Sequence, residues 1–309
     1  MVIARKKVKS KPKISRSVKL FILFATILPV CNWLIFYAYA NASSFLMAFT
    51  GSDGGWSLEN FRRLANEFHL PTSDIRIALR NTLLTFGINF VLFIPQVMVS
   101  YFIYKKIPGY KFYRIIFFLP TVLFSVCVSM CFVKMVGVNG FIAKAVGEFL
   151  NLGYTPELLA DSRFANATVL INMIWLGFPG DLIIWGGTFA RIPTDVLESA
   201  KLDGVTWWQE FTKVIVPLVW PTVSLKLVLT VCGVFGASGQ VYLLTGGQFG
   251  TMTLSAWQYI TLRNGSGSAY TSNIYNYLSA VGLVMTVIAV AISLMVRKIT
   301  DKAFDEVDF

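Results

Sequence analysis

Long stretches without a single charged residue restrict the folds open to this sequence. Residues 82–104 and 115–133 carry no Asp, Glu, Lys or Arg, and neither do 20–52, 227–262 and 264–296. An apolar stretch of about 20 residues is long enough to cross a bilayer as a helix. Soluble domains carry about a quarter charged residues, whereas this chain has 14%. The sequence therefore predicts an all-α, polytopic membrane helical bundle.

We predict about six transmembrane helices from the length of these apolar runs, at 20–40, 82–104, 114–133, 166–189, 222–243 and 275–296. The chain then divides into a basic tail, a first span with its outer loop, a core domain and a C-terminal tail, over residues 1–19, 20–77, 78–297 and 298–309.

The net charge of +11 is unevenly distributed along the chain. Segments 1–19 and 105–114 are rich in Lys and Arg and contain no acid. Cytoplasmic segments near span ends carry such an excess, so we predict that both termini are cytoplasmic and that the protein lies in the cytoplasmic membrane. Topology and contact with anionic lipid account for the charge, and we expect no nucleic-acid partner.

Two features near the N-terminus allow other interpretations. The stretch "AYANAS" at 38–43 contains an Ala-x-Ala pattern typical of signal-peptide cleavage. The apolar run before it is longer than a signal peptide requires, which favours an uncleaved first span. His69 is the single histidine, and every cysteine falls inside a predicted span, so we expect neither a metal site nor a disulfide framework.

The connections between the spans are modest in length, and some are predicted to contain short helices. The stretch "SLENFRRLANEF" at 57–68 places apolar residues three or four apart, which is typical of an amphipathic helix. Loop 134–165 has a similar pattern. The Gly-, Ser- and Thr-rich segment 246–273 is expected to hold a short interfacial or re-entrant helix.

Loop 190–221 is the most informative segment, because it carries charges between two apolar spans. Asp195 precedes Glu198 by three positions, and Thr206 precedes Gln209 by three, and both pairs match the capping-box pattern. Gly204 lies where a left-handed residue would end a helix. We predict a helix at 195–203, a turn at Gly204 and a helix at 206–216 that Pro217 stops.

Both predicted loop helices are amphipathic. The second aligns Trp207, Phe211, Val214 and Ile215 along one side. An elbow of this kind either seals the bundle against lipid headgroups or docks a cytoplasmic partner.

The loop resembles the "EAA" loop of ATP-binding-cassette importer permeases. Glu198-Ser199-Ala200, Asp203-Gly204 and then Val214-Ile215-Val216-Pro217 follow that family's spacing. Similar blocks are "LRNTLLTF" at 79–86, "YRIIFFLP" at 113–120 and "VYLLTGG" at 241–247, the last typical of the maltose-type carbohydrate subgroup. The resemblance implies that an ATPase docks on Glu198, Ser199, Ala200, Asp203, Gly204, Trp207, Phe211 and Pro217.

The resemblance also implies the partners. They are a second, different permease subunit, two cytoplasmic ATPase subunits that hold ATP and magnesium, an extracytoplasmic solute-binding protein, membrane lipid and a carbohydrate substrate. This chain itself contains no G-x-x-x-x-G-K-[ST] motif. We therefore expect no cofactor on this chain and no enzymatic activity of its own.

Polar and aromatic residues within the spans are candidates for the solute pathway: Asp181, Gln240, Tyr242, Asn172 and Trp175. An intramembrane carboxylate is costly unless it faces water or a partner, so Asp181 either lines the pathway or bonds to a neighbouring helix. Lys226 is expected to extend its ammonium toward the cytoplasm. Two alternatives stay open, namely the same importer moving another solute and a channel or carrier without an ATPase.

Overall fold

A computed structural model describes residues 15–70, 73–236, 239–265 and 271–302. Within these ranges the chain is helical, and its β pairing is limited to one isolated bridge between Thr50 and Trp56. The all-α prediction is confirmed. The described part holds five helices that are long and apolar enough to cross a membrane, or up to six if one bent pair counts as a span.

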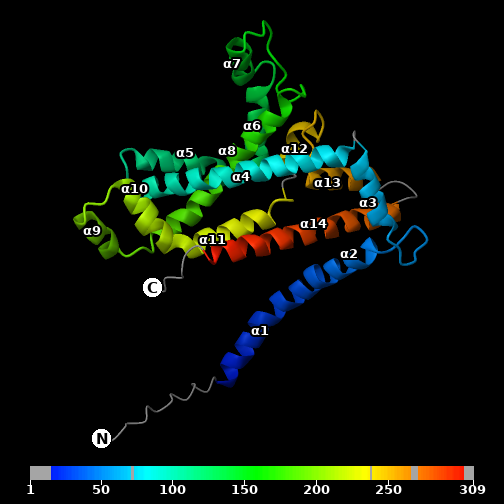
Figure 1. Ribbon diagram of the computed structural model, residues 1–309, viewed down its shortest axis with the longest axis horizontal. Helices are drawn as coiled ribbons and strands as arrows, with labels where there is room; N and C mark the ends of the chain where they lie inside the picture. The colour runs from blue at the N-terminus through cyan, green and yellow to red at the C-terminus, as the bar shows by residue number, and fades with distance from the viewer. Residues whose placement is uncertain (1–14, 71–72, 237–238, 266–270, 303–309) are drawn as a thin grey trace, which may run out of the picture.

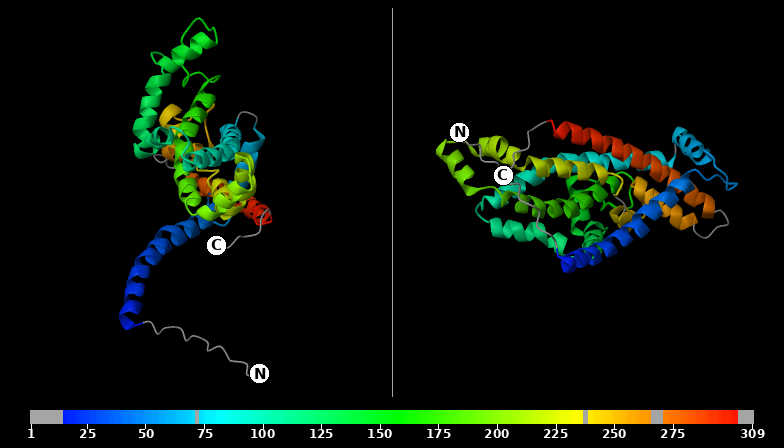
Figure 2. Two further views of the ribbon diagram at one scale, coloured as in Figure 1. Left: turned by 90° about the vertical axis from the view of Figure 1, so that its left-hand side faces the viewer. Right: turned by 90° about the horizontal axis from the view of Figure 1, so that it is seen from below.

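The first of these helices is continuous over Arg16–Ala48. It comprises α1 (Arg16–Trp33), a π-helical turn (Leu34–Tyr39) and α2 (Ala40–Ala48). No residue of α1 is buried, and α1 lies apart from the bundle, whereas α2 approaches α14 (Figures 1 and 2). An apolar helix with so little contact to its own chain is suited to lipid or to another subunit.

The bundle consists of α4 (Asp74–Tyr104), α8 (Ala165–Phe189), α11 (Val216–Cys232) and α14 (Thr271–Thr300). Figure 1 shows these helices running along the long axis of the molecule. At one end, residues of α4, α8, α11 and the segment between α8 and α11 form a buried cluster of Phe93, Val97, Tyr101, Trp185, Phe189, Ile192, Leu197, Phe211, Ile215, Val219 and Val223. Five of its eleven buried members are aromatic, and the cluster joins the segment 190–215 to the ends of these helices.

The predicted span 114–133 is not one straight helix. The structure forms α5 (Tyr110–Val122) and α6 (Ser125–Val136), bent by 104°. Leu123 and Phe124 have extended backbones, so the hydrogen bonds of an uninterrupted helix are lost there. Average hydropathy does not register such a bend. α6 and the following α7 (Phe141–Phe149) project from the bundle as a separate lobe (Figure 1).

The predicted end of the second loop helix at Pro217 is wrong. One helix runs from Trp207 to Cys232 through α10 (Trp207–Gln209), a π-helical segment (Glu210–Ile215) and α11. The π-helical segment restarts the α-helical pattern at Val216, which places Pro217 in the first turn of α11. Proline is accommodated there beside the π-helical segment, in which the Val216 amide donates to the Phe211 carbonyl five residues earlier instead of four.

The predicted span 222–243 is also not a single helix. α11 ends at Cys232, and α12 (Gly239–Thr245) is a separate short helix. Gln240 and Tyr242 therefore belong to α12 rather than to a membrane-length helix.

The predicted short helices are confirmed as α3 (Glu59–His69), α7 and α13 (Leu254–Gly265). α3 and α13 lie at the end of the bundle opposite to α9 and α10 (Figure 1). The hydroxyl of Tyr277 in α14 donates to the Glu67 carboxylate at 2.6 Å, and the Arg63 guanidinium lies 4.3 Å from the Tyr277 ring centre. These contacts hold α3 against α14.

Candidate functional site

The segment 190–215 forms a helical hairpin at one end of the bundle. α9 (Thr194–Leu202) is followed by Gly204, whose φ of +70° is the left-handed conformation that the sequence predicted. Thr206 and Gln209 form the predicted capping box, with bonds of 2.9 and 3.4 Å. The capping box predicted at Asp195 and Glu198 is wrong, because α9 begins one residue earlier and is capped by Pro193 without a side-chain bond.

Burial separates the predicted docking residues into two groups. Ala200 and Phe211 are buried and Pro217 is partly buried. The exposed group consists of Glu198, Ser199, Asp203, Gly204 and Trp207. The buried group anchors the hairpin, and the exposed group is available to another molecule.

Two exposed apolar residues of the hairpin were not predicted as docking residues. Leu202 at the end of α9 is 89% exposed and Trp208 is 49% exposed. The ring centres of the exposed Trp207 and Trp208 lie 5.5 Å apart, and contiguous exposed apolar surface marks interaction sites. The sequence signal for Leu202 is its position directly before the Asp203-Gly204 turn.

The base of the hairpin is held by aromatic packing and a buried ion pair. The rings of Phe211 and Tyr101 lie 5.2 Å apart, and those of Trp207 and Phe102 lie 5.6 Å apart. Glu210 is only 5% exposed and forms an ion pair with Lys105, the residue that follows α4. These contacts join the hairpin to α4, so a displacement of one is transmitted to the other.

Asp181 and Lys226 form an ion pair between α8 and α11, with 2.5 Å between Nζ and Oδ1. Their side chains are 21% and 20% exposed. Each charge therefore neutralises the other within the apolar bundle, which removes most of the cost of an isolated intramembrane charge. The Lys226 ammonium is directed to Asp181 rather than extended alone toward the cytoplasm.

The other pathway candidates lie on contacting helices, because Val169 of α8 and Val241 of α12 share one buried cluster. Trp175 is partly exposed, and its ring lies 6.0 Å from that of Phe132. Asn172 is fully buried, and neither polar atom of its side chain has a hydrogen-bond partner among the described residues.

Tyr242 lies beside two residues that sequence reasoning did not select. Its ring centre is 5.0 Å from that of Tyr259 and 5.6 Å from the Arg263 guanidinium. Asp181 is nine positions along α8 from Asn172, or about 13 Å at 1.5 Å per residue. The structure thus separates the Asp181 ion pair from the aromatic group on α12 and α13.

Asn81 fixes the loop between α12 and α13. Its amide donates to the carbonyl oxygens of Gly250 and Met252 at 2.6 and 2.8 Å, and its oxygen accepts from Asn166 at 3.0 Å. The neighbouring Thr82 hydroxyl accepts from the Leu254 amide at 2.9 Å. Sequence reasoning used this Asn-Thr pair only as part of a resemblance, because its partners lie far away along the chain.

Replacing Asn81 by Ala is expected to release the loop 246–254. Two carbonyl oxygens and Asn166 would lose their partner, and each unmade buried bond costs about 1–3 kcal/mol. Hydrogen exchange in residues 246–254 should become about tenfold faster or more. Asn89→Ala, an exposed change on the same helix, is the matched control. Equal exchange in both variants would show that Asn81 does not hold the loop.

Two cavities lie next to this region. One of about 650 Å³ is bounded by α2, α13 and α14 and lined by Ser255, Gln258, Tyr259 and Tyr275, among others. A second of about 470 Å³ shares Gln258, Gly282 and Thr286 with the first. The two cavities therefore meet along one face of α14. Gln258 was not a predicted pathway residue, because its position in α13 becomes significant only when α14 is placed beside it.

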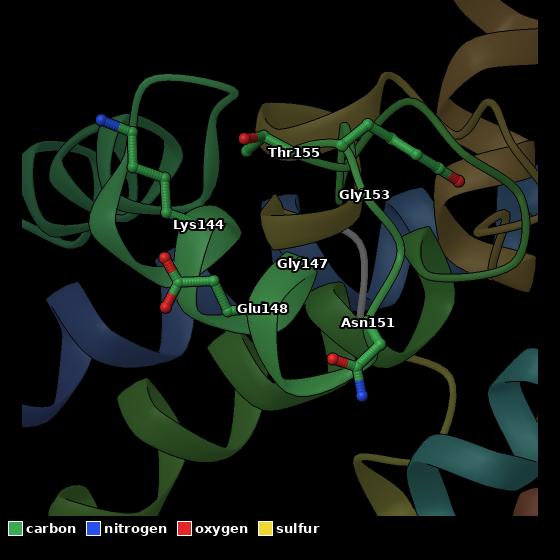
Figure 3. A pocket seen from close by; sticks show the side chains of 7 residues that line it. Lys144, Gly147, Glu148, Asn151, Gly153 and Thr155 are labelled. Atoms are coloured by element: carbon green, nitrogen blue, oxygen red, sulfur yellow. The ribbon is translucent and has the colours of Figure 1, made fainter.

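A third cavity of about 680 Å³ lies in the projecting lobe. Lys144 and Glu148 extend from α7, and Thr155 comes from the loop that follows (Figure 3). This loop is ordered by Arg163, which donates to Asp161 at 2.6 Å and to the Tyr154 hydroxyl at 3.0 Å. The hydrogen bonds from Arg163 lower the pKa of the Asp161 carboxyl.

The helical spans define the class of this protein as a polytopic membrane protein. Residues 2–305 match the family described as "Binding-protein-dependent transport system inner membrane component". The chain belongs to this family.

The chain is similar to named permeases over about three fifths of its length. It is 27% identical over 198 residues to the multiple sugar-binding transport system permease protein MsmF of Streptococcus mutans serotype c, covering 64% of this chain and 66% of the relative. It is 27% identical over 195 residues to the maltose/maltodextrin transport system permease protein MalF of Vibrio vulnificus, covering 61% and 36%. The matched region therefore spans between about one third and two thirds of these relatives.

A solved structure shares the fold. It is described as a bacterial ABC transporter involved in the import of the acidic polysaccharide alginate. The TM-score is 0.76 at 21% identity, with 93% of this chain and 98% of the other chain covered. The agreement extends over almost the whole helical arrangement.

Proposed function

We propose that this chain is a permease subunit of an ATP-driven importer that moves a sugar or oligosaccharide across the cytoplasmic membrane. The observation that supports this proposal most strongly is the hairpin of α9 and α10. Its surface exposes Glu198, Leu202 and Asp203 for contact with another protein, and Phe211 and Glu210 fix its base to the bundle. The hairpin is suited to the cytoplasmic side, with both termini on that side as well.

In this proposal a separate ATPase subunit grips the exposed face of the hairpin. ATP and magnesium bind to that subunit and not to this chain. Closure of two ATPase subunits would move the hairpin, and the contacts of Phe211 with Tyr101 and of Glu210 with Lys105 would pass the motion to α4. The hairpin then has two positions, and both ATP binding to the ATPase and the state of the spans shift the balance between them. In this way ATP energy is coupled to transport.

The pathway would be completed by a second permease subunit, and a solute-binding protein would deliver the substrate from outside. The names of the relatives, which include multiple sugar and maltodextrin permeases, support a carbohydrate. The Tyr242 and Tyr259 rings are suited to sugar faces, and the amides of Gln240 and Asn172 are suited to hydroxyls. A carrier driven by ions would need several coupled charged groups within the membrane, whereas Asp181 is neutralised by Lys226.

The test replaces the most exposed apolar residue of the hairpin. Leu202→Asp should reduce co-purification of the ATPase about tenfold or more, because a charge then enters the centre of the contact. Radiolabelled sugar uptake should fall in parallel. Phe149→Asp is the matched control, since Phe149 is 85% exposed at the end of α7, in the projecting lobe.

Full ATPase recovery with Leu202→Asp would contradict the docking proposal. Uptake of amino acids or peptides instead of sugars by the unmodified protein would contradict the assigned substrate class while leaving the docking proposal intact.

A further inference from the structure

A groove of about 550 Å³ lies between α4, α5 and α8. It is at the same end of the bundle as the hairpin, because it includes the last turn of α4 and the last turns of α8. The residues that line it are Ser100, Ile103, Tyr104, Lys106, Tyr110, Arg114, Phe118, Leu182, Ile183, Gly186, Gly187 and Ala190. None of these residues was predicted for docking or for the solute pathway.

The charged residues that line the groove are both cations. Lys106 and Arg114 are both exposed, which places them at its mouth, and none of the described residues that line it is acidic. Neither cation forms an ion pair with a described residue, whereas the adjacent Lys105 is already paired with Glu210. The Arg114 guanidinium is held 5.8 Å above the Phe118 ring. The mouth therefore presents two positive charges that an anion can neutralise.

The inner part of the groove is apolar and open. Its walls are formed by side chains such as Ile103, Phe118 and Leu182. Gly186 and Gly187 form part of the α8 wall, and a β-carbon at either position would meet no atom within 4 Å. Asp181 lies on the opposite face of α8, since five residues at 100° each place it well away from Gly186. Among the described residues, the charged groups that line the groove are thus Lys106 and Arg114.

We infer that this groove binds one anionic phospholipid of the cytoplasmic leaflet, with its phosphate between Lys106 and Arg114 and an acyl chain along Gly186 and Gly187. Basic pockets between spans on the cytoplasmic side are suited to anionic headgroups. A zwitterionic lipid offers the same chain but no net charge, so the charge of the mouth selects the anionic class. The position in the cytoplasmic leaflet rests on the orientation in the proposed function.

The site also has a mechanical consequence. α4 and α8 both contribute walls, and Lys105, the neighbour of Lys106, holds the hairpin through Glu210. A lipid in the groove therefore contacts the elements that connect the hairpin to the spans.

The test measures how many lipid molecules stay bound to the protein when it is purified together with its partner subunits. The protein is equilibrated with equal amounts of phosphatidylglycerol and phosphatidylcholine and examined by native mass spectrometry. The unmodified protein should retain one phosphatidylglycerol in preference to phosphatidylcholine. In the Lys106→Gln, Arg114→Gln double variant this preference should fall about thirtyfold, since each basic residue contributes a factor of about five.

Two further variants make the result specific to the groove. Gly186→Leu, Gly187→Leu fills the space for the acyl chain and should reduce retention of both lipids, while the added side chains enter open space. Lys298→Gln removes a charge at the end of α14, outside the groove, and should leave retention unchanged.

Equal retention by the unmodified protein and the double variant would overturn the inference. Retention that does not distinguish the two lipids would overturn the anionic selectivity. If the glycine variant alters sugar uptake in phosphatidylcholine vesicles and leaves lipid retention unchanged, the groove belongs to the solute pathway and the lipid site is refuted. Co-purification of the ATPase is measured on the same samples, so failure of the proposed function is recognised separately.

Discussion

Asp181→Asn is expected to lower the stability and the membrane abundance of this protein. The change leaves the Lys226 ammonium without its partner at a position where its side chain is only 20% exposed. Breaking a buried ion pair by removing one partner costs about 3–5 kcal/mol, and the residual exposure places the expected loss near the lower end of that range. The measurements are the midpoint of thermal unfolding in detergent and the amount of protein in the membrane.

A double variant separates stability from a direct role in transport. Asp181→Asn with Lys226→Gln leaves two neutral groups that can hydrogen-bond, so stability and abundance should largely return. Uptake per molecule should return with them if Asp181 acts through the ion pair. A single Asp181→Asn variant with normal stability and abundance but low uptake would instead assign Asp181 to the solute pathway.

Glu210→Ala is expected to loosen the hairpin from α4. Glu210 is 5% exposed and its partner Lys105 is partly buried, so removal of the carboxylate leaves a poorly solvated ammonium at the hairpin base. A loss of about 3 kcal/mol is expected for such a pair. Because the same contact connects the hairpin to α4, ATPase activity should become independent of solute. The measurements are thermal unfolding and solute-stimulated ATP hydrolysis in the assembled transporter.

The controls for this variant use the same hairpin and the same pair. Glu198→Ala, on the exposed side of α9, should leave the unfolding midpoint unchanged. Glu210→Leu combined with Lys105→Met removes both charges and should restore much of the stability, as apolar pairs replace buried ion pairs well. An unchanged midpoint in Glu210→Ala would show that the pair contributes no net stability.

Local chemistry in the hairpin could be predicted because its signals are close in sequence. The left-handed turn at Gly204 and the capping box at Thr206 depend on neighbours within about three residues, and both were found. Pro217 was misjudged for a related reason. The π-helical segment before it places the proline in a first helical turn, and apolar periodicity does not indicate where a π-helical segment occurs.

The pathway candidates show the limit of reasoning from single positions. Asp181 and Lys226 were both recognised as unusual charges in apolar segments, yet they were not paired, because they are separated by the whole hairpin and only the packing of α8 against α11 brings them together. Asn81 was noted for its resemblance to a motif, but its partners at Gly250 and Met252 are defined only by the folded loop.

The sequence by itself determined that this protein is a helical membrane bundle with a capped hairpin at one end. The length of an apolar run and the capping of a helix depend on residues close together in the sequence, so they can be predicted without knowing the tertiary contacts. Tertiary structure alone decided the 104° break between α5 and α6, the two buried ion pairs and the cationic groove beside Gly186. Each of these depends on which faces of distant helices meet, and helix packing selects those faces through the shape and charge of residues far apart along the chain.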